Sequence, residues 1–210
     1  LDPGSTPAEN GQFMLFLVAV IKAVDEYQDL LRLSVASAGN DPRLGENEAP
    51  PAIVSVYIGE ELAEILDSIE KGVKYSGKAK QVMKLGVDTL PEFPKDTTDR
   101  NRTSPFAFTG NKFEFRMPGS TFSIAGPNIM INTIVADVLR EFADELEKAE
   151  DFHAALHALV VRTIKKHKRI IFNGNNYSEE WTKEAAKRGL LNLRNTAEAL
   201  PHFAHKKNIK

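Results

Sequence analysis

The chain of 210 residues contains no cysteine, which excludes a disulfide scaffold and any cysteine-ligated zinc or iron–sulfur centre. This lack fits a reducing compartment, and we expect a cytoplasmic protein. A surplus of one charge is also missing: the formal net charge is −2, so no general attraction to nucleic acid or to an anionic membrane is expected. The longest apolar run, residues 13–21, is far shorter than the roughly 20 residues that cross a bilayer, and no basic segment precedes it as in a signal peptide.

The composition that remains is that of a globular protein, with 42% hydrophobic and 27% charged residues. We find no internal repeat, and we treat residues 1–210 as a single unit. The chain begins with Leu1 rather than with methionine, and neither end reads as a natural terminus. We therefore expect a piece of a longer chain, in which a site built from distant segments would be only partly present.

The spacing of apolar residues predicts a mixed α and β chain with several long helices. A proline and a carboxylate within residues 6–9 predict a helix start, and the apolar face that follows extends to about residue 33. Further helices are predicted for residues 60–71, 125–146, 151–168, 178–188 and 196–203, and strands for residues 52–58 and 112–116. Residues 72–110 are expected to be irregular.

A polar loop at residues 42–51 carries Arg43 and Glu48 between glycine and proline residues. A planar guanidinium suits a carboxylate or phosphate ligand, and a nearby carboxylate can order a cation or accept a proton. Taken alone, the loop fits better a solvated surface segment with a chance ion pair, because exposed charge pairs are common and weak.

A second polar loop at residues 99–105 carries Arg100 and Arg102, two guanidinium groups one residue apart. Arginine side chains and backbone amides of such a loop can bind a polyphosphate. The glycine pattern of a Walker loop is missing here, so the loop is not assigned as one.

Residues 112–116 alternate strictly, so Phe113 and Phe115 are expected on one face of a strand and Lys112, Glu114 and Arg116 on the other. A carboxylate between two cations has a lowered pKa, stays ionised and can bind a metal. By itself the pattern is equally compatible with an amphipathic strand whose charged face meets water.

In their order along the chain, these three segments resemble the glutamine synthetase family. The motifs are Arg43 to Pro50, Asn101-Arg102-Thr103 and Lys112 to Arg116, and residues 36–41 and 168–178 are similar to its type III branch. The resemblance covers nearly the whole chain. It implies an α+β fragment of the catalytic domain, with antiparallel strands forming part of the active-site sheet against several long helices. Residues 59–99 would be an insertion and residues 173–210 a tail, both specific to the branch.

For the glutamate end of the reaction, the resemblance implies roles for three residues. Arg43 and Arg116 would bind glutamate, and Arg116 could instead lie at the subsite of the transferred phosphoryl group. Glu48 would be the catalytic residue of a flap that covers the site and would accept a proton from ammonium.

For the nucleotide end, the resemblance implies three further roles. Arg102 would contact the ATP phosphates and favour phosphoryl transfer. Lys112 would bind ATP where other branches carry an arginine. Glu114 would ligate Mg²⁺ or Mn²⁺.

The activity implied is that of an ATP-dependent glutamate–ammonia ligase, which forms glutamine through γ-glutamyl phosphate in homo-oligomeric, dodecameric rings. The family's other metal ligands are expected upstream of residue 1, so the isolated chain is expected to be inactive. Three alternatives stay open: a related glutamate–amine ligase, a nucleotide-binding regulatory pseudoenzyme of the same fold, and a structural helical module.

Overall fold

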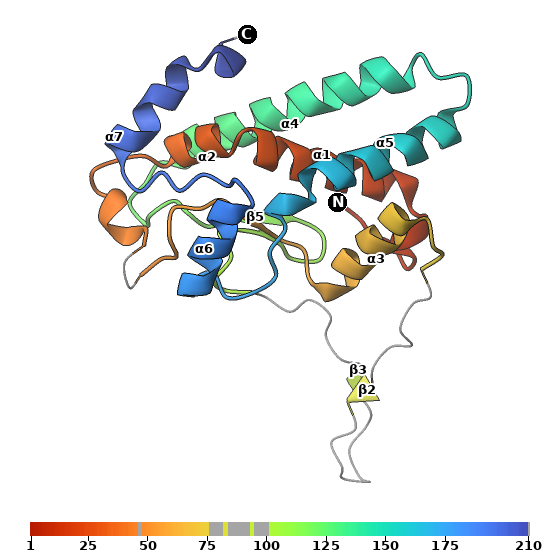
Figure 1. The fold of residues 1–210 in the computed structure, drawn as a ribbon, viewed down its shortest axis with the longest axis horizontal. Coiled ribbons are helices and arrows are strands. Elements are labelled where there is room, and N and C mark those ends of the chain that lie inside the picture. The colour runs from red at the N-terminus through yellow and green to blue at the C-terminus, as the bar shows by residue number, and fades with distance from the viewer. Residues whose placement is uncertain (46–47, 76–81, 84–92, 95–100, 210) are drawn as a thin grey trace.

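The computed structural model describes residues 1–45, 48–75, 82–83, 93–94 and 101–209. These residues form a mostly helical α+β fold in which helices lie against a small sheet (Figure 1). In the described part of the chain there are seven α-helices: α1 (Gly11–Glu26), α2 (Gln28–Ser34), α3 (Glu60–Lys71), α4 (Ala125–Leu146), α5 (Phe152–His167), α6 (Glu179–Lys187) and α7 (Thr196–Ala199). The strands described are β1 (Val56–Tyr57), β2 (Val82–Met83), β3 (Phe93–Pro94), β4 (Phe106–Phe108) and β5 (Phe113–Phe115).

Helix α1 contacts both α4 and α5 and lies at the centre of the helical layer. The side chain of Asn10 accepts a hydrogen bond from the amide of Phe13 and so caps the helix. The predicted start at residues 6–9 was therefore wrong, because Pro7–Glu9 is a separate 3-10 turn and the α-helix begins at Gly11.

The single helix predicted to reach about residue 33 is interrupted at Tyr27, which separates α1 from α2. The backbone of Tyr27 lies outside the helical region, with φ −115° and ψ 28°. The Tyr27 hydroxyl donates a hydrogen bond of 2.6 Å to Asp137 on α4. Burial of the ring, together with this bond to a carboxylate, raises the pKa of the Tyr27 hydroxyl.

The other helices lie where the apolar spacing predicted them. Helix α3 begins and ends at the predicted residues, and α4, α5 and α6 match within a residue or two. The last pattern, at residues 196–203, is only partly α-helical, because α7 passes into a 3-10 helix at Leu200–Ala204. Pro201 lies within that segment and lacks the amide an α-helix would need there.

The three-stranded sheet is mixed, in the order β1-β4-β5. Strands β4 and β5 are antiparallel, as expected, but β1 pairs with β4 in parallel, with Val56 opposite Phe106. The expectation of antiparallel strands was therefore only partly right. Parallel neighbours need a long crossover, and the chain between β1 and β4 includes α3.

Two further expectations about strands need correction. Residues 52–58 are all buried, as predicted, but only Val56 and Tyr57 pair in the ladder. Residues 72–110 are not irregular throughout, because this stretch contains β4 and the short antiparallel pair β2–β3. Three residues, Phe-Ala-Phe after a proline, are too few to reveal an alternating pattern, so β4 gave no sequence signal.

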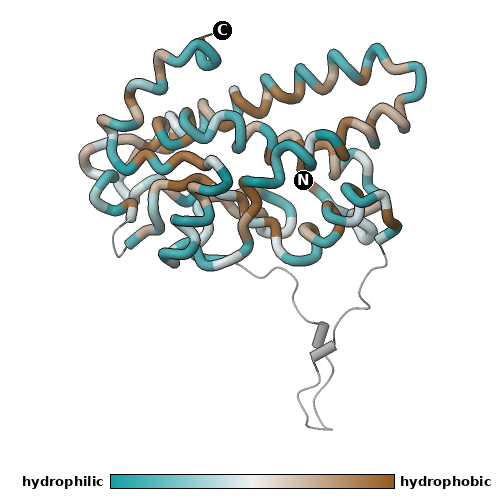
Figure 2. Tube along the Cα trace, in the orientation of Figure 1, coloured by the Kyte–Doolittle hydropathy of each residue, from teal (hydrophilic) through white to brown (hydrophobic). Residues whose placement is uncertain are grey.

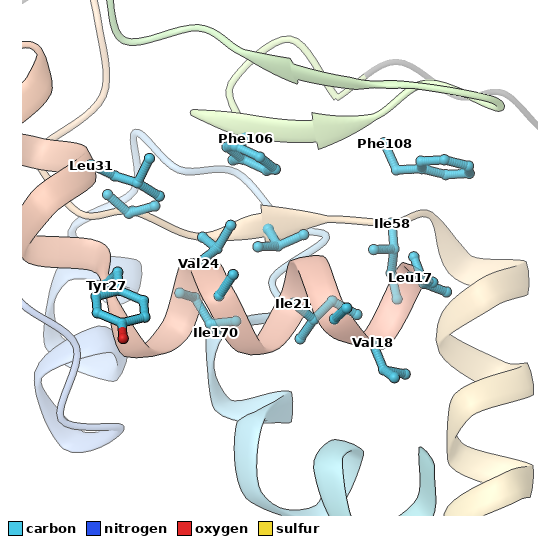
Figure 3. Close-up of a cluster of buried hydrophobic side chains, with 14 of the residues drawn as sticks. Leu17, Val18, Ile21, Val24, Tyr27, Leu31, Ile58, Phe106, Phe108 and Ile170 are labelled. Carbon is cyan, nitrogen blue, oxygen red and sulfur yellow. The ribbon is translucent and has the colours of Figure 1, made fainter. Parts of the chain in front are cut away.

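The hydrophobic core lies between α1 and the sheet. In Figure 3, Leu17, Ile21 and Val24 point from α1 toward the strands, and Phe106 and Phe108 extend from β4 toward the helix. Apolar and hydrophilic positions alternate along α4 (Figure 2), which buries Ile134, Val138 and Phe142 one turn apart. Among the described helices, none has the length and apolar character needed to cross a bilayer.

Candidate functional site

The hairpin formed by β4 and β5 separates an aromatic face from a charged one. The rings of Phe113 and Phe115 lie 5.4 Å and 5.8 Å from the ring of Phe106, measured between centroids. Glu114 lies opposite Ala107 in the register, and its side chain is directed to the other face with those of Lys112 and Arg116. The predicted division of the two faces is confirmed.

Glu114 is ionised at neutral pH and is held mainly by Arg116. Its Oε2 accepts hydrogen bonds from Nη2 of Arg116 at 2.9 Å and from Nε at 3.2 Å. Its Oε1 lies 3.3 Å from the Thr109 hydroxyl and 4.0 Å from Nζ of Lys112, whose side chain is 68% exposed. The hydrogen bonds from Arg116 are the largest cause that lowers the pKa of Glu114, as the sequence predicted.

Arg116 also contacts the second predicted loop. Its Nη1 donates a hydrogen bond of 2.5 Å to the carbonyl oxygen of Asn101. Arg102, the next residue, has an exposed side chain. Arg102 is thus exposed to solvent on a loop that contacts Arg116. Arg100 lies outside the described residues.

Arg43 lies at the end of a 3-10 turn, Asp41–Arg43, and its Nη1 donates hydrogen bonds to Asn40 Oδ1 at 2.7 Å and to the carbonyl of Met117 at 3.3 Å. Its Nε lies 3.5 Å from Oε2 of Glu48, whose side chain is 74% exposed. Gly45 (φ 91°) turns the chain between them, in the left-handed region that favours glycine. The loop thus leaves Glu48 exposed beside Arg43.

The structure brings the predicted site residues into one region. Met117 accepts a hydrogen bond from Arg43 and directly follows Arg116, so the first loop adjoins the charged face of β5. Arg116 in turn contacts the loop that carries Arg102. The Arg43 loop, 74 residues before Met117, and the Arg102 loop therefore both contact residues 116–117.

The side chains of this region show whether the site could bind a divalent cation. The ionised carboxylate of Glu114 fits as one ligand, because Mg²⁺ and Mn²⁺ prefer oxygen donors. Within the described ranges, no group of three or more histidine, aspartate or glutamate side chains could hold a metal ion. Among the described residues, Glu114 is therefore a candidate ligand for such a cation.

Asn40 and Thr109 were missed from the sequence, and Asn101 was named as part of a motif but given no role. Asn40 is buried, orients Arg43 through Oδ1 and donates through Nδ2 to the carbonyls of Val35 and Met117. Asn101 and Thr109 contact Arg116 and Glu114, respectively. Lone asparagines and threonines in loops carry no periodic signal, so only their place beside the motifs could have singled them out.

A family model described as the glutamine synthetase C-terminal domain matches residues 155–210. The similarity of residues 155–210 to this domain agrees with the resemblance that the three motifs carry.

Similarity to full-length relatives extends over the whole chain. Over 213 residues the chain is 49% identical to the type-3 glutamine synthetase of Dictyostelium discoideum, a match that covers 100% of the chain and 29% of that protein. It is 48% identical over 219 residues to a glutamine synthetase of Butyrivibrio fibrisolvens, with 100% of the chain and 30% of the relative covered. The chain is therefore homologous along its whole length to glutamine synthetases, one of them described as type-3, and it spans less than a third of the length of these relatives.

Proposed function

We propose that the full-length protein is an ATP-dependent glutamate–ammonia ligase and that this chain supplies one part of its active site. The observation that carries the proposal is the meeting of Arg43, Arg116, Glu114 and the Arg102 loop at residues 116–117. Guanidinium groups and an ionised carboxylate grouped in this way suit a reaction among carboxylate and phosphate groups. The similarity to type-3 glutamine synthetases supports the same activity.

In the proposed reaction, an oxygen of the glutamate side-chain carboxylate forms a bond to the terminal phosphorus of ATP, and ADP leaves. Arg43 and Arg116 hold the glutamate, and Arg102 and Lys112 face the phosphates. Positive charge fixed in place before the reaction lowers the barrier, because it meets the charge that develops on the transferred group. A divalent cation, bound through Glu114 and further ligands, would neutralise phosphate charge when present.

In the second step, ammonia forms a bond to the acyl carbon of γ-glutamyl phosphate, and phosphate leaves. Glu48 accepts the proton that the nitrogen loses. The Glu48 carboxylate lies 3.5 Å from Nε of Arg43 and is exposed, so its oxygens are accessible to take this proton. Closure of the loop over the acyl phosphate would protect it from water.

The remaining parts of the proposal concern the whole protein. Dodecameric rings are proposed for it, as are the assignments of residues 59–99 as an insertion and residues 173–210 as a tail of this branch. Because ATP, glutamate and ammonium would be its substrates, we place it in the cytoplasm. We propose that this chain alone is inactive, since it spans less than a third of the length of the relatives that it matches.

The test is consumption of ATP by the full-length enzyme with glutamate and ammonium added separately and together. Wild type is expected to turn over only when both are present, and Glu114→Ala is expected to lose turnover and bind Mn²⁺ more weakly. A wild type that needs another amine would favour the related glutamate–amine ligase. A folded wild type that binds ATP without turnover would favour the pseudoenzyme.

A further inference from the structure

The C-terminal segment that follows Ile171 contacts both loops of the candidate site. It reaches the Arg102 loop through residues 173–176 and the Arg43 loop through residues 193–196. None of these residues belongs to the three motifs. The contacts are hydrogen bonds between segments far apart in sequence.

At the Arg102 loop, a turn at residues 173–176 holds both neighbours of Arg102. Nδ2 of Asn101 donates to the carbonyls of Asn173 and Gly174, at 3.1 Å and 2.6 Å. The Thr103 hydroxyl donates to Asn101 Oδ1 at 2.6 Å and accepts from the backbone amide of Asn176 at 3.0 Å. The exposed Arg102 thus lies between Asn101 and Thr103, both of which are hydrogen-bonded to this turn.

The same turn is anchored to the interior of the protein. Asn176 is 1% exposed, and its Oδ1 accepts a hydrogen bond of 2.7 Å from the buried Ser55 hydroxyl. Oδ1 of Asn173 accepts from the amides of Ile58 and Gly59, directly after β1. These hydrogen bonds connect the Arg102 loop, through residues 173–176, to the chain on either side of β1 and so fix its position relative to the sheet.

At the Arg43 loop, Asp41 is the corresponding link. Its Oδ1 accepts a hydrogen bond of 2.8 Å from Arg32 Nη2, and its Oδ2 accepts one of 2.7 Å from the amide of Thr196. Arg32 is 1% exposed and also donates from Nε to the carbonyl of Leu193. Asp41 and Arg43 belong to the same 3-10 turn, so this link sets where the guanidinium of Arg43 lies.

We propose that the C-terminal segment positions the two substrate ends of the site separately: Thr103 acts through Arg102 on ATP, and Asp41 acts through Arg43 on glutamate. Both are positioning residues. The inference rests on the proposed function, and it assigns to residues 173–196 a part in substrate binding. A displacement of a binding group by about 1 Å is enough to weaken a site substantially.

The experiment uses the full-length enzyme and measures the KM for ATP and for glutamate in each variant. Thr103→Val removes the hydroxyl but keeps the side-chain volume, and it should raise the KM for ATP about tenfold with the KM for glutamate unchanged, as expected for the loss of one or two hydrogen bonds. Asp41→Asn should raise the KM for glutamate by a similar factor and leave the KM for ATP unchanged. Each variant is the control for the other.

Thr103→Ser keeps the hydroxyl and should restore the KM for ATP. Asn101→Asp is nearly isosteric and removes the donor to Asn173 and Gly174, so it should reproduce the effect of Thr103→Val if that variant fails to fold. A purely structural role would lower the thermal midpoint and the amount of active enzyme in both variants without this crossed change in KM.

The two possible failures are distinguishable. An inactive wild type overturns the proposed function and with it the inference. An active wild type whose Thr103→Val and Asn101→Asp variants keep the KM for ATP, or whose variants change both KM values together, overturns the inference alone.

Discussion

Helix α1 and strand β5 both carry charged residues, but they keep them in opposite surroundings. On α1, Asp25 is 3% exposed, with His167 Nδ1 at 2.8 Å and Arg169 Nε at 2.9 Å. On β5, the carboxylate of Glu114 remains more than a third exposed beside Arg116. Charges of the first kind join elements of the fold, whereas those of the second kind remain accessible to a ligand.

If buried charges join elements of the fold, the largest loss of stability is expected when the buried Asp25 is replaced. Asp25→Asn should lower the free energy of unfolding by about 1.5–3 kcal/mol, because the buried His167 and the partly exposed Arg169 lose the buried carboxylate that they contact. Chemical denaturation of the wild type and the variant measures this loss. Asp67→Asn, which removes an exposed pair with Lys71 on α3, is the matched control and should leave the free energy of unfolding nearly unchanged. Equal effects of the two variants would contradict the distinction.

A second effect is expected at the glutamate end of the site. Arg43→Ala in the full-length enzyme should raise the KM for glutamate roughly 10- to 100-fold, as for the loss of a charged hydrogen bond, and the KM for ATP less. Steady-state kinetics with each substrate varied in turn measures both constants. Arg162→Ala removes an exposed arginine paired with Glu145 between α4 and α5 and serves as the control. The reverse ranking of the two KM values would remove Arg43 from the glutamate site.

The contribution of the Asp41 carboxylate to the stability of the protein should depend on pH. Burial raises the pKa of Asp41, but hydrogen bonds from Arg32 and Thr196 outweigh it, so the pKa lies below its ordinary value. A lowered folded-state pKa means stability that is present above the unfolded pKa and is lost as pH falls through the folded one. The stability difference between wild type and Asp41→Asn should therefore shrink on acidification below about pH 4. A difference that stays constant down to pH 2 would contradict this account.

The smallest effect is expected for the stability contribution of Glu114. Glu114→Gln should change the free energy of unfolding by less than about 1 kcal/mol, because the ion pair with Arg116 is partly exposed to solvent. Denaturation is measured on the same full-length preparations as turnover, which the variant should lose. A large loss of stability would mean that Glu114 is mainly structural.

Local patterns in the sequence were sufficient for much of this architecture. The bounds of α3 and the two faces of β5 follow from spacing alone, because helices and strands repeat at fixed intervals. The parallel pairing of β1 with β4 and the break at Tyr27 depend on contacts with distant residues. The same holds for the site: the motifs singled out Arg43 and Glu114, but no local pattern predicts that Asn176 bonds to Thr103, 73 residues earlier.

The hydrogen bonds from residues 173–196 have a consequence for the order in which the molecule matures during translation. The loops with Arg43 and Arg102 leave the ribosome before the residues that hold them, and domains begin to fold as they emerge. Their final geometry must therefore wait until Thr196 has been synthesised. A nascent chain released before residue 173 should have the Asn101 and Asp41 loops open to protease, and one released after residue 196 should have them protected.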